Sequence, residues 1–412
     1  MKLLVILGSG SSAPLGMPLV RDLNLLMNDW GAEWATGKWG TQFDPYHGFS
    51  DHFSKLRRRM SEQDSGHPLA INFENVLGYM TTLAHSMEPP PWGDPLVRQV
   101  SLSPLALEFV DGPTVELNSE YSFLFRRLAS HMRSLSTKID WDRDSAKGYR
   151  NFLATLRNEF ELGIYNLNYD NAALRALQGT FTGFSDSGTF QPVSVHDRTA
   201  WDFTYHLHGS VHHSFKDQGG NEICWRKNLI GDQFYDGDGP EAQSLTDRRS
   251  GNLMLPRTTL VAGGLKLDQL LVEPFHSFHA SLVRHVYAAD AILIGGYGFG
   301  DTHINYALHN RLSHSQDRPP VMVLDRVCDK RRLESVEDRA NWNDPWAVQL
   351  KRTLRADVFK SSSRGSLPRD VFEEASYCRV AVWQGGFVEA ESQLSHIIRW
   401  LGDTCDILAH SG

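Results

Sequence analysis

The sequence of 412 residues has few cysteines, and their spacing forms no recognisable pattern. The four are far apart, at Cys224, Cys328, Cys378 and Cys405, and none belongs to a CxxC pair. Such a set predicts neither a disulfide framework nor a zinc ribbon, and unpaired thiols are typical of a reducing compartment. We therefore expect a cytoplasmic protein that holds no metal.

Long apolar runs and an excess of positive charge are also missing. The first apolar run, Leu3 to Leu7, is far shorter than the roughly 18 residues that span a membrane, and its direct passage into glycines argues against a signal peptide. The formal net charge is -8, which disfavours sequence-independent binding of nucleic acid. A basic run at residues 55–59 is explained most simply as a solvated helix face. We expect no membrane segment and no direct nucleic-acid contact.

Five short apolar runs predict strands that are buried on both faces, as in a parallel sheet covered by helices. They are residues 3–7, 163–165, 291–294, 321–324 and 380–383. Each run ends in a glycine-rich or polar turn, and ligands of open α/β sheets bind at the carboxyl ends of the strands. The predicted fold is α/β with a Rossmann-like parallel sheet.

Apolar residues at helical spacing predict helices around residues 124–135, 152–160 and 394–401. The remaining segments look like elaborations of one domain. Its core is predicted at about 1–30, 149–326 and 378–402, with a large helical insertion at 31–148 and a second insertion at 327–377. A stretch rich in Gly, Asp, Asn and Arg predicts a long surface loop at residues 212–256.

The first predicted strand leads into a turn that is suited to hold phosphate, residues 8–12 with the sequence Gly-Ser-Gly-Ser-Ser. Gly8 and Gly10 allow a tight turn and a close backbone approach, while the serines add hydroxyl donors. A following helix would direct free N–H groups at the anion. Position 13 is alanine, so the standard G-x-G-x-x-G fingerprint is not met. Taken alone, the stretch is also compatible with a plain strand-to-helix turn.

The second predicted strand ends in Asn-Leu-Asn-Tyr-Asp at residues 166–170. The amide of Asn168 could hold a water or a ribose hydroxyl beside a reacting carbon. The carboxylate of Asp170 could orient an amide or stabilise developing positive charge. An Asn/Asp-rich turn that merely closes a strand is the simpler alternative.

Histidines gather at residues 206–213. The imidazole of His208 suits a general base, because its ordinary pKa of about 6.5 lets it take a proton near neutral pH. Its neighbours His206, His212 and His213 suggest a metal site, but no carboxylate or cysteine stands at a standard ligand spacing. We expect His206 to be a core or surface histidine.

Together these motifs resemble the SIR2 family, in the family's order and over nearly the whole chain. The first turn is similar to the family's first NAD-binding loop, Asn168 and Asp170 match its Thr-Gln-Asn-Ile-Asp motif, and His208 with Gly209 matches its His-Gly pair. A glycine-rich turn at residues 295–301 is similar to the family's Gly-Thr-Ser turn, in the variant of bacterial SIR2-like proteins. The resemblance implies catalytic roles for Asn168, Asp170 and His208. It implies NAD contacts from Gly8, Ser9, Gly10, Ser11, Ser12, Gly16, Pro18, Gly295, Gly296, Tyr297 and Asp325.

Departures from the family narrow the expected activity. The usual Asp-Phe-Arg is replaced by Leu-Val-Arg at residues 19–21, the two CxxC pairs of deacylases are absent, and no peptide-pairing strand is evident at residues 261–267. The chain thus resembles SIR2-like NAD hydrolases of prokaryotic anti-phage defence, for which NAD is the substrate and nicotinamide and ADP-ribose are the products.

The same resemblance implies a regulated assembly, with a homo-oligomer and a HerA-like ATPase as candidate partners and the two insertions as natural contact surfaces. A protein deacylase or ADP-ribosyltransferase is an open alternative. A non-catalytic NAD or ADP-ribose sensor is another, although a sensor would need neither Asn168 nor His208.

Overall fold

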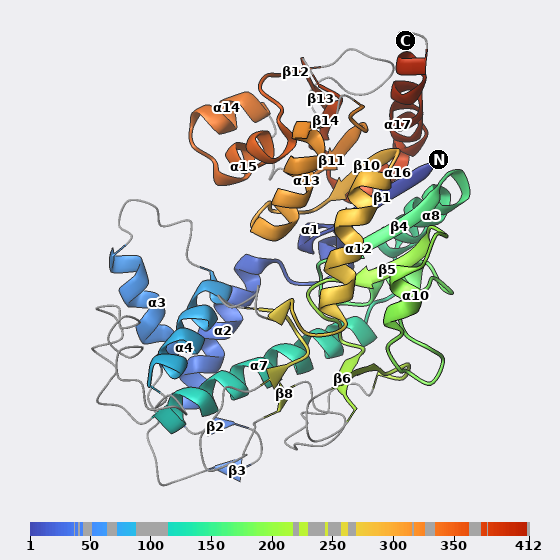
Figure 1. The fold of residues 1–412 in the computed structure, drawn as a ribbon. Helices are drawn as coiled ribbons and strands as arrows, with labels where there is room; N and C mark the ends of the chain where they lie inside the picture. Colours follow the sequence, from blue (N-terminus) through green and yellow to red (C-terminus); the bar gives the residue numbers. More distant parts are fainter. Residues whose placement is uncertain are drawn as a thin grey trace.

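The computed structural model describes residues 1–36, 38–39, 42–43, 52–63, 72–87, 114–216, 222–229, 244–245, 257–262, 269–314, 317–325, 334–361, 372–376 and 378–409. Within these residues, an eight-stranded sheet in the order β12-β13-β14-β11-β10-β1-β4-β5 has helices packed on both faces (Figure 1). The predicted α/β class with a Rossmann-like parallel sheet is confirmed.

Six neighbouring strands of the sheet run parallel. They are β1 (Lys2–Leu7), β4 (Glu161–Asn166), β5 (Asp202–His206), β10 (Ala291–Gly295), β11 (Val321–Leu324) and β14 (Val380–Trp383). The five predicted strands are all present. β5 has no counterpart among them, because its sequence Asp-Phe-Thr-Tyr-His is too polar to read as an apolar run, although four of its five residues are buried.

The first strand, β1, lies at the point where the strand order reverses, between β10 on one side and β4 on the other. Its alternate side chains enter two different cores. Leu3, Val5 and Leu7 belong to the core on one face, and Leu4 and Ile6 belong to the core on the other. Since ligands of doubly wound sheets bind at such a reversal, the carboxyl end of β1 is the expected place for a site.

Helices cover the two faces of the sheet. On the face of Leu3 lie α8 (Asp144–Glu159), α16 (Gly386–Ser392) and α17 (Leu394–Ala409). On the other lie α10 (Pro192–His196), α12 (Phe275–Ala288), α13 (Thr302–His314), α14 (Val336–Asn341) and α15 (Pro345–Leu354). The predicted helices around residues 152–160 and 394–401 correspond to α8 and α17 and are confirmed.

Four helices pack together beside the sheet and are called the helical module here (Figure 1). They are α2 (Val20–Ala35), α3 (His52–Gln63), α4 (Phe73–Met87) and α7 (Thr114–Thr137). The predicted helix at 124–135 lies inside α7. The module joins the core on the face of Leu3, and the expected insertion boundaries at residues 30 and 148 fall inside α2 and α8. A small pair, β2 (Lys38–Trp39) and β3 (Gln42–Phe43), follows α2.

The basic run lies on α3. Lys55 and Arg58 are exposed, as expected for a solvated helix face. Arg57 is partly buried, and its guanidinium donates to the backbone oxygen of Asn24 on α2 at 3.3 Å.

The segment at 212–256 departs from the predicted surface loop where it is described. A hairpin of β6 (His213–Phe215) and β7 (Ile223–Trp225) places Phe215 and Ile223 in a small core with Phe275. β8 (Ser244–Leu245) pairs with β9 (Arg257–Thr258), and the rest of the segment lies outside the described residues. The apolar residues were hidden from sequence inspection by the polar residues around them.

Within the predicted insertion at 327–377, the described residues add to the edge of the sheet. After α14 and α15, β12 (Phe359–Ser361) and β13 (Phe372–Ala375) pair antiparallel and join β14. None of the helices in the described ranges is long and apolar enough to cross a membrane.

Candidate active site

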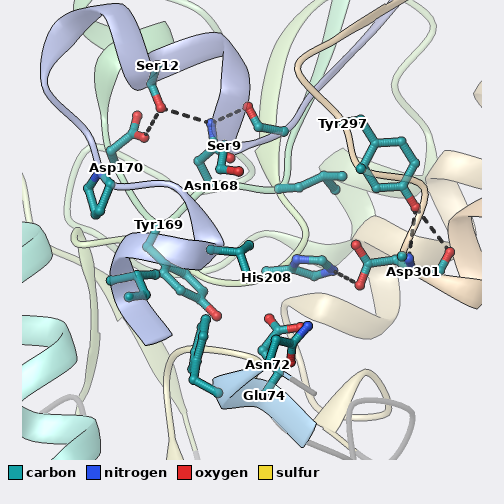
Figure 2. A pocket seen from close by; sticks show the side chains of 18 of the residues that line it. Ser9, Ser12, Asn72, Glu74, Asn168, Tyr169, Asp170, His208, Tyr297 and Asp301 are labelled. Atoms are coloured by element: carbon teal, nitrogen blue, oxygen red, sulfur yellow. Dashed lines mark hydrogen bonds and ion pairs between the residues drawn. The ribbon is translucent and has the colours of Figure 1, made fainter. Parts of the chain in front are cut away.

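A cavity of about 780 Å³ opens where the carboxyl ends of β1, β4 and β10 meet the helical module (Figure 2). Its volume is within the usual range for sites that bind small ligands. It is lined by Gly8, Ser9, Ser12, Pro18, Val20, Leu23, Asn72, Phe73, Glu74, Asn75, Met132, Leu167, Asn168, Tyr169, Asp170, His208, Tyr297, Gly298, Gly300, Asp301, Thr302, His303 and Tyr306.

The predicted phosphate turn is formed by α1 (Ser9–Ser12) and a 3-10 turn, η1 (Ala13–Leu15). It packs against the turn after β10, backbone to backbone. The N–H of Gly8 donates to Gly295 O at 2.9 Å, and the N–H of Gly10 donates to Gly296 O at 3.0 Å. A Cβ on Gly8 would lie 2.5 Å from Gly296 O, and one on Gly296, whose φ is +62°, would lie 2.1 Å from Ser11 N. These glycines are therefore required for the two turns to touch each other.

Asn168 ties the end of β4 to this turn. Its Nδ2 donates to Gly8 O at 3.0 Å and to Ser12 Oγ at 3.2 Å, and its own N–H donates to Asn166 Oδ1 at 3.0 Å. The residue is buried yet lines the cavity. The asparagine predicted to hold water beside a ribose is thus held rigidly by its amide nitrogen (Figure 2).

Asp170 stands behind the turn and is 1% exposed. Ser12 Oγ donates to Oδ2 at 2.7 Å, and the N–H of Ala172 donates to Oδ1 at 2.9 Å. Burial raises the pKa of Asp170 above its ordinary value, and the two hydrogen bonds offset part of that effect. Both carboxylate oxygens therefore bind the protein itself, and Asp170 fixes Ser12 and, through it, Asn168.

His208 follows β5 and lines the same cavity as Asn168 (Figure 2). Its carbonyl accepts from the N–H of Val261 at 2.8 Å. Gly209, at φ +90°, forms a bridge with Leu260, where a Cβ would lie 2.2 Å from Thr259 O. Position 209 therefore requires glycine, because the backbone of Thr259 and Leu260 leaves no room for a Cβ. The neighbouring segment is buried at Leu260–Ala262, and residues 263–268 lie outside the described part of the chain.

The turn after β10 carries Tyr297 and Asp301 into the cavity wall. The hydroxyl of Tyr297 accepts from the N–H of Asp301 at 3.1 Å and donates to Asn305 Oδ1 at 3.0 Å. Burial raises the pKa of Tyr297 well above its ordinary value, so the hydroxyl keeps its proton. Tyr297 thereby fixes the turn that presents Asp301 at the start of α13 (Figure 2).

The helical module supplies a wall of the cavity that sequence inspection did not find. Phe73 and Glu74 come from the first turn of α4, and Met132 comes from α7. α4 starts at a reciprocal cap: Asn75 N donates to Asn72 Oδ1 at 3.0 Å, and Asn72 N donates to Asn75 Oδ1 at 2.9 Å. The Asn-x-x-Asn spacing could have indicated a helix start, but no local signal tells that this start faces the cavity.

Several predicted NAD contacts do not line the cavity. Gly10, Ser11, Gly16, Gly295 and Gly296 lie in or behind the two touching turns. Asp325 follows β11, and its Oδ2 lies 3.7 Å from Arg339 Nη1. The Nε of the same arginine donates to Asp344 Oδ2 at 2.9 Å. This buried arginine, rather than the cavity, is the neighbour of the Asp325 carboxylate.

The other predicted histidines form a buried group around Trp225. The ring of His212 stacks on Trp225 with centroids 4.6 Å apart, and His213 meets it edge-on at 5.6 Å. Burial lowers the pKa of His206 to about 3 and lowers the pKa values of His212 and His213 too. We interpret His206 as a core residue, as expected. In the described part of the chain, no cluster of His, Cys, Asp or Glu could hold a metal ion.

Comparison with known proteins identifies the central part of the chain. Residues 163–344 match the family model described as the SIR2-like domain. This segment is therefore similar to SIR2-like domains. The match begins after the phosphate turn, so β1 and the helical module lie outside it, whereas Asn168, His208 and Asp301 lie inside the matched segment.

Solved structures of Sir2 homologues are similar to the chain. A mutant Sir2 homologue in complex with 2'-O-acetyl ADP ribose has 13% identity and a TM-score of 0.40, over 97% of this chain and 92% of that one. A Sir2 homolog–NAD complex has 11% identity and a TM-score of 0.38, over 97% and 89%. No curated protein matches the sequence.

Proposed function

We propose that this protein is an NAD hydrolase that cleaves the bond between nicotinamide and ribose. One observation carries the proposal: the turn at residues 8–12, Asn168 and His208 come from three different strand ends and meet at one cavity of about 780 Å³. The match of residues 163–344 to the SIR2-like domain supports the choice of NAD, since the SIR2 family resembled by the motifs acts on it. We therefore take NAD as the substrate, with no metal.

The residues suggest how the bond is broken. As the bond between ribose C1' and nicotinamide nitrogen lengthens, its electron pair moves to the ring nitrogen and positive charge builds on the ribose. Asn168, whose Nδ2 donates to Gly8, Ser11 and Ser12 in the turn, would hold the attacking water. His208 takes a proton from that water, or from a ribose hydroxyl that stabilises the cation. Asp170 acts indirectly, by holding Ser12.

Water is the expected acceptor for two reasons. The sequence lacks the CxxC pairs of deacylases. In addition, the segment beside the His-Gly pair, Leu260–Ala262, is already buried against the protein. The products would be nicotinamide and ADP-ribose. We retain a deacylase or ADP-ribosyltransferase as the alternative, and a sensor without turnover as the other.

The biological setting follows from the resemblance to defence proteins. We propose a cytoplasmic effector that depletes NAD during phage infection. Control of such an activity would come from assembly as a homo-oligomer and with a HerA-like ATPase. Light scattering at micromolar concentration should then give a mass above the 46.5 kDa of one chain. A strict monomer that is fully active alone would count against assembly control.

The decisive experiment tests whether the oxygen of water is incorporated into ADP-ribose. Protein, alone and with candidate partners, is incubated with NAD in oxygen-18 water, and mass spectrometry should find one labelled oxygen on the ADP-ribose. The His208→Ala variant should lose about 100-fold or more of the nicotinamide release. Ser187→Ala, in an exposed turn that does not line the cavity, is the control and should behave like the wild type. O-acetyl-ADP-ribose that forms only with acetyl-lysine peptide, without other turnover, would overturn the proposal.

A further inference from the structure

We infer that Asp301 is the positioning residue of His208, so that the two form a carboxylate–imidazole pair in the cavity wall. The proposed reaction assigns no role to Asp301, which is the last residue of the glycine-rich turn at residues 295–301. The inference rests on the proposed function, because it assigns the partner of the proposed base.

The geometry brings the two side chains together from distant parts of the chain. His208 Nε2 lies 3.7 Å from Asp301 Oδ1, and the side chains are 5% and 15% exposed. In low-dielectric surroundings a carboxylate this close to an imidazole favours its protonated form. The distance exceeds that of a hydrogen bond, and such contacts in a ligand-free enzyme commonly tighten when the substrate binds.

Asp301 is itself held firmly, which a positioning role requires. Its N–H is bound by the Tyr297 hydroxyl at 3.1 Å, and its carbonyl accepts from the N–H groups of Ile304 and Asn305 at 3.1 and 3.0 Å in the first turn of α13. The backbone is therefore fixed at both sides of the residue. The carboxylate remains directed at His208 (Figure 2).

Other titratable groups also face the pair. The His303 ring on α13 lies 5.6 Å from that of His208, and the His279 ring on α12 lies 5.3 Å from His303. Glu74 of α4 lines the same cavity. Among the described residues that line it, none is a lysine or arginine. Because the Asp301 carboxylate lies 3.7 Å from the imidazole, its removal should change the charge beside His208 directly.

The pair has a defined part in the reaction. The C1'–nitrogen bond breaks with its electron pair going to nicotinamide, and the water oxygen forms a new bond to C1'. One water proton passes to the ring nitrogen of His208 that faces away from Asp301, and later to solvent. Asp301 stays ionised, keeps the imidazole in one orientation and stabilises the imidazolium.

The test compares Asp301→Asn with the wild type by two readouts. In steady-state assays, kcat should fall about tenfold or more with little change in KM, and the acid limb of the kcat/KM profile should move to lower pH. By NMR of the histidine ring protons, with the His208 signal assigned by its loss in His208→Ala, the titration midpoint of His208 should fall by about one pH unit.

A structural control separates positioning from simple loss of order. Tyr297→Phe removes the hydroxyl that holds the Asp301 N–H but keeps the carboxylate charge. It should lower stability and move the His208 midpoint less than Asp301→Asn does, because the carboxylate charge is retained. If Asp301→Asn has the same His208 titration midpoint and the same acid limb of the kcat/KM profile as the wild type, the inferred carboxylate–imidazole pair is wrong. A wild type without NAD cleavage in any assembly state would instead refute the proposed function, and the NMR titration would still decide on the pair.

Discussion

The buried contact between Ser12 and Asp170 gives the sharpest prediction. Ser12→Ala removes a hydrogen bond of 2.7 Å to a carboxylate that is 1% exposed, and also the 3.2 Å bond from Asn168. A hydrogen bond to a charged group contributes about 1.5–3 kcal/mol. We expect the free energy of unfolding to fall by about 2 kcal/mol at pH 8, which is roughly a 30-fold change in the folding equilibrium.

The size of this loss should depend on pH. Burial raises the pKa of Asp170, so the stability associated with its protonated form is present at low pH and is lost as the pH rises through that raised value. The Ser12 hydroxyl favours the ionised form and offsets part of that loss. The gap between wild type and Ser12→Ala should therefore be small at acid pH and widen as the pH rises.

Ser11→Ala is the matched control. Ser11 is buried next to Ser12, but its hydroxyl has neutral partners: it donates to the carbonyl of Gly8 at 2.8 Å and accepts from Asn168 Nδ2 at 3.4 Å. Its loss should cost about 1 kcal/mol at every pH. Urea unfolding followed by tryptophan fluorescence between pH 4.5 and pH 8.5 measures both variants. Equal losses that do not change with pH would refute the idea that Ser12 stabilises an ionised Asp170.

Three further predictions concern the turns, the histidine core and the metal. Gly296→Ala should cost about 3 kcal/mol or more, because its Cβ would lie 2.1 Å from Ser11 N at a φ of +62°; a thermal unfolding curve like that of the wild type would contradict it. The pKa of His206 is lowered to about 3, so its neutral ring contributes stability that is lost as pH falls from about 6.5 towards 3. His206→Gln should flatten that part of the stability profile in urea unfolding at pH 7 and pH 5. Elemental analysis of chelator-washed protein should find no stoichiometric zinc, and one tightly held zinc per chain would prove this wrong.

The sequence predicted the sheet better than it predicted the walls of the cavity. Apolar runs such as Leu3–Leu7 are informative because a strand buried on both faces must be apolar throughout. β5 escaped notice because the Thr204 and His206 side chains are polar, although both are buried. Their burial depends on contacts made by residues far away in the chain, which no local pattern records.

The candidate site was predictable where it follows a strand end and hidden where it comes from the helical module. Asn168 and His208 each stand just after a strand, and parallel strands bring their carboxyl ends to one edge. Glu74 reaches the cavity because α4 packs on α2 and α7, a tertiary arrangement that helix periodicity alone cannot specify. Asp325 stands after β11, where the sequence predicted it, but it does not line the cavity. Its carboxylate lies beside Arg339 instead.

The contact between the turns after β1 and β10 also has a consequence for synthesis of the protein on the ribosome. β1 is made first, yet its partner β10 emerges much later; the bond from Lys2 N to the Asp290 side chain spans 288 residues of chain. The turn at Gly8 cannot reach its final shape before Gly295 and Gly296 are available to support it. Interrupted translation products that end before β10 therefore lack the support for the turn at Gly8, and the cavity that carries the candidate site is incomplete in them.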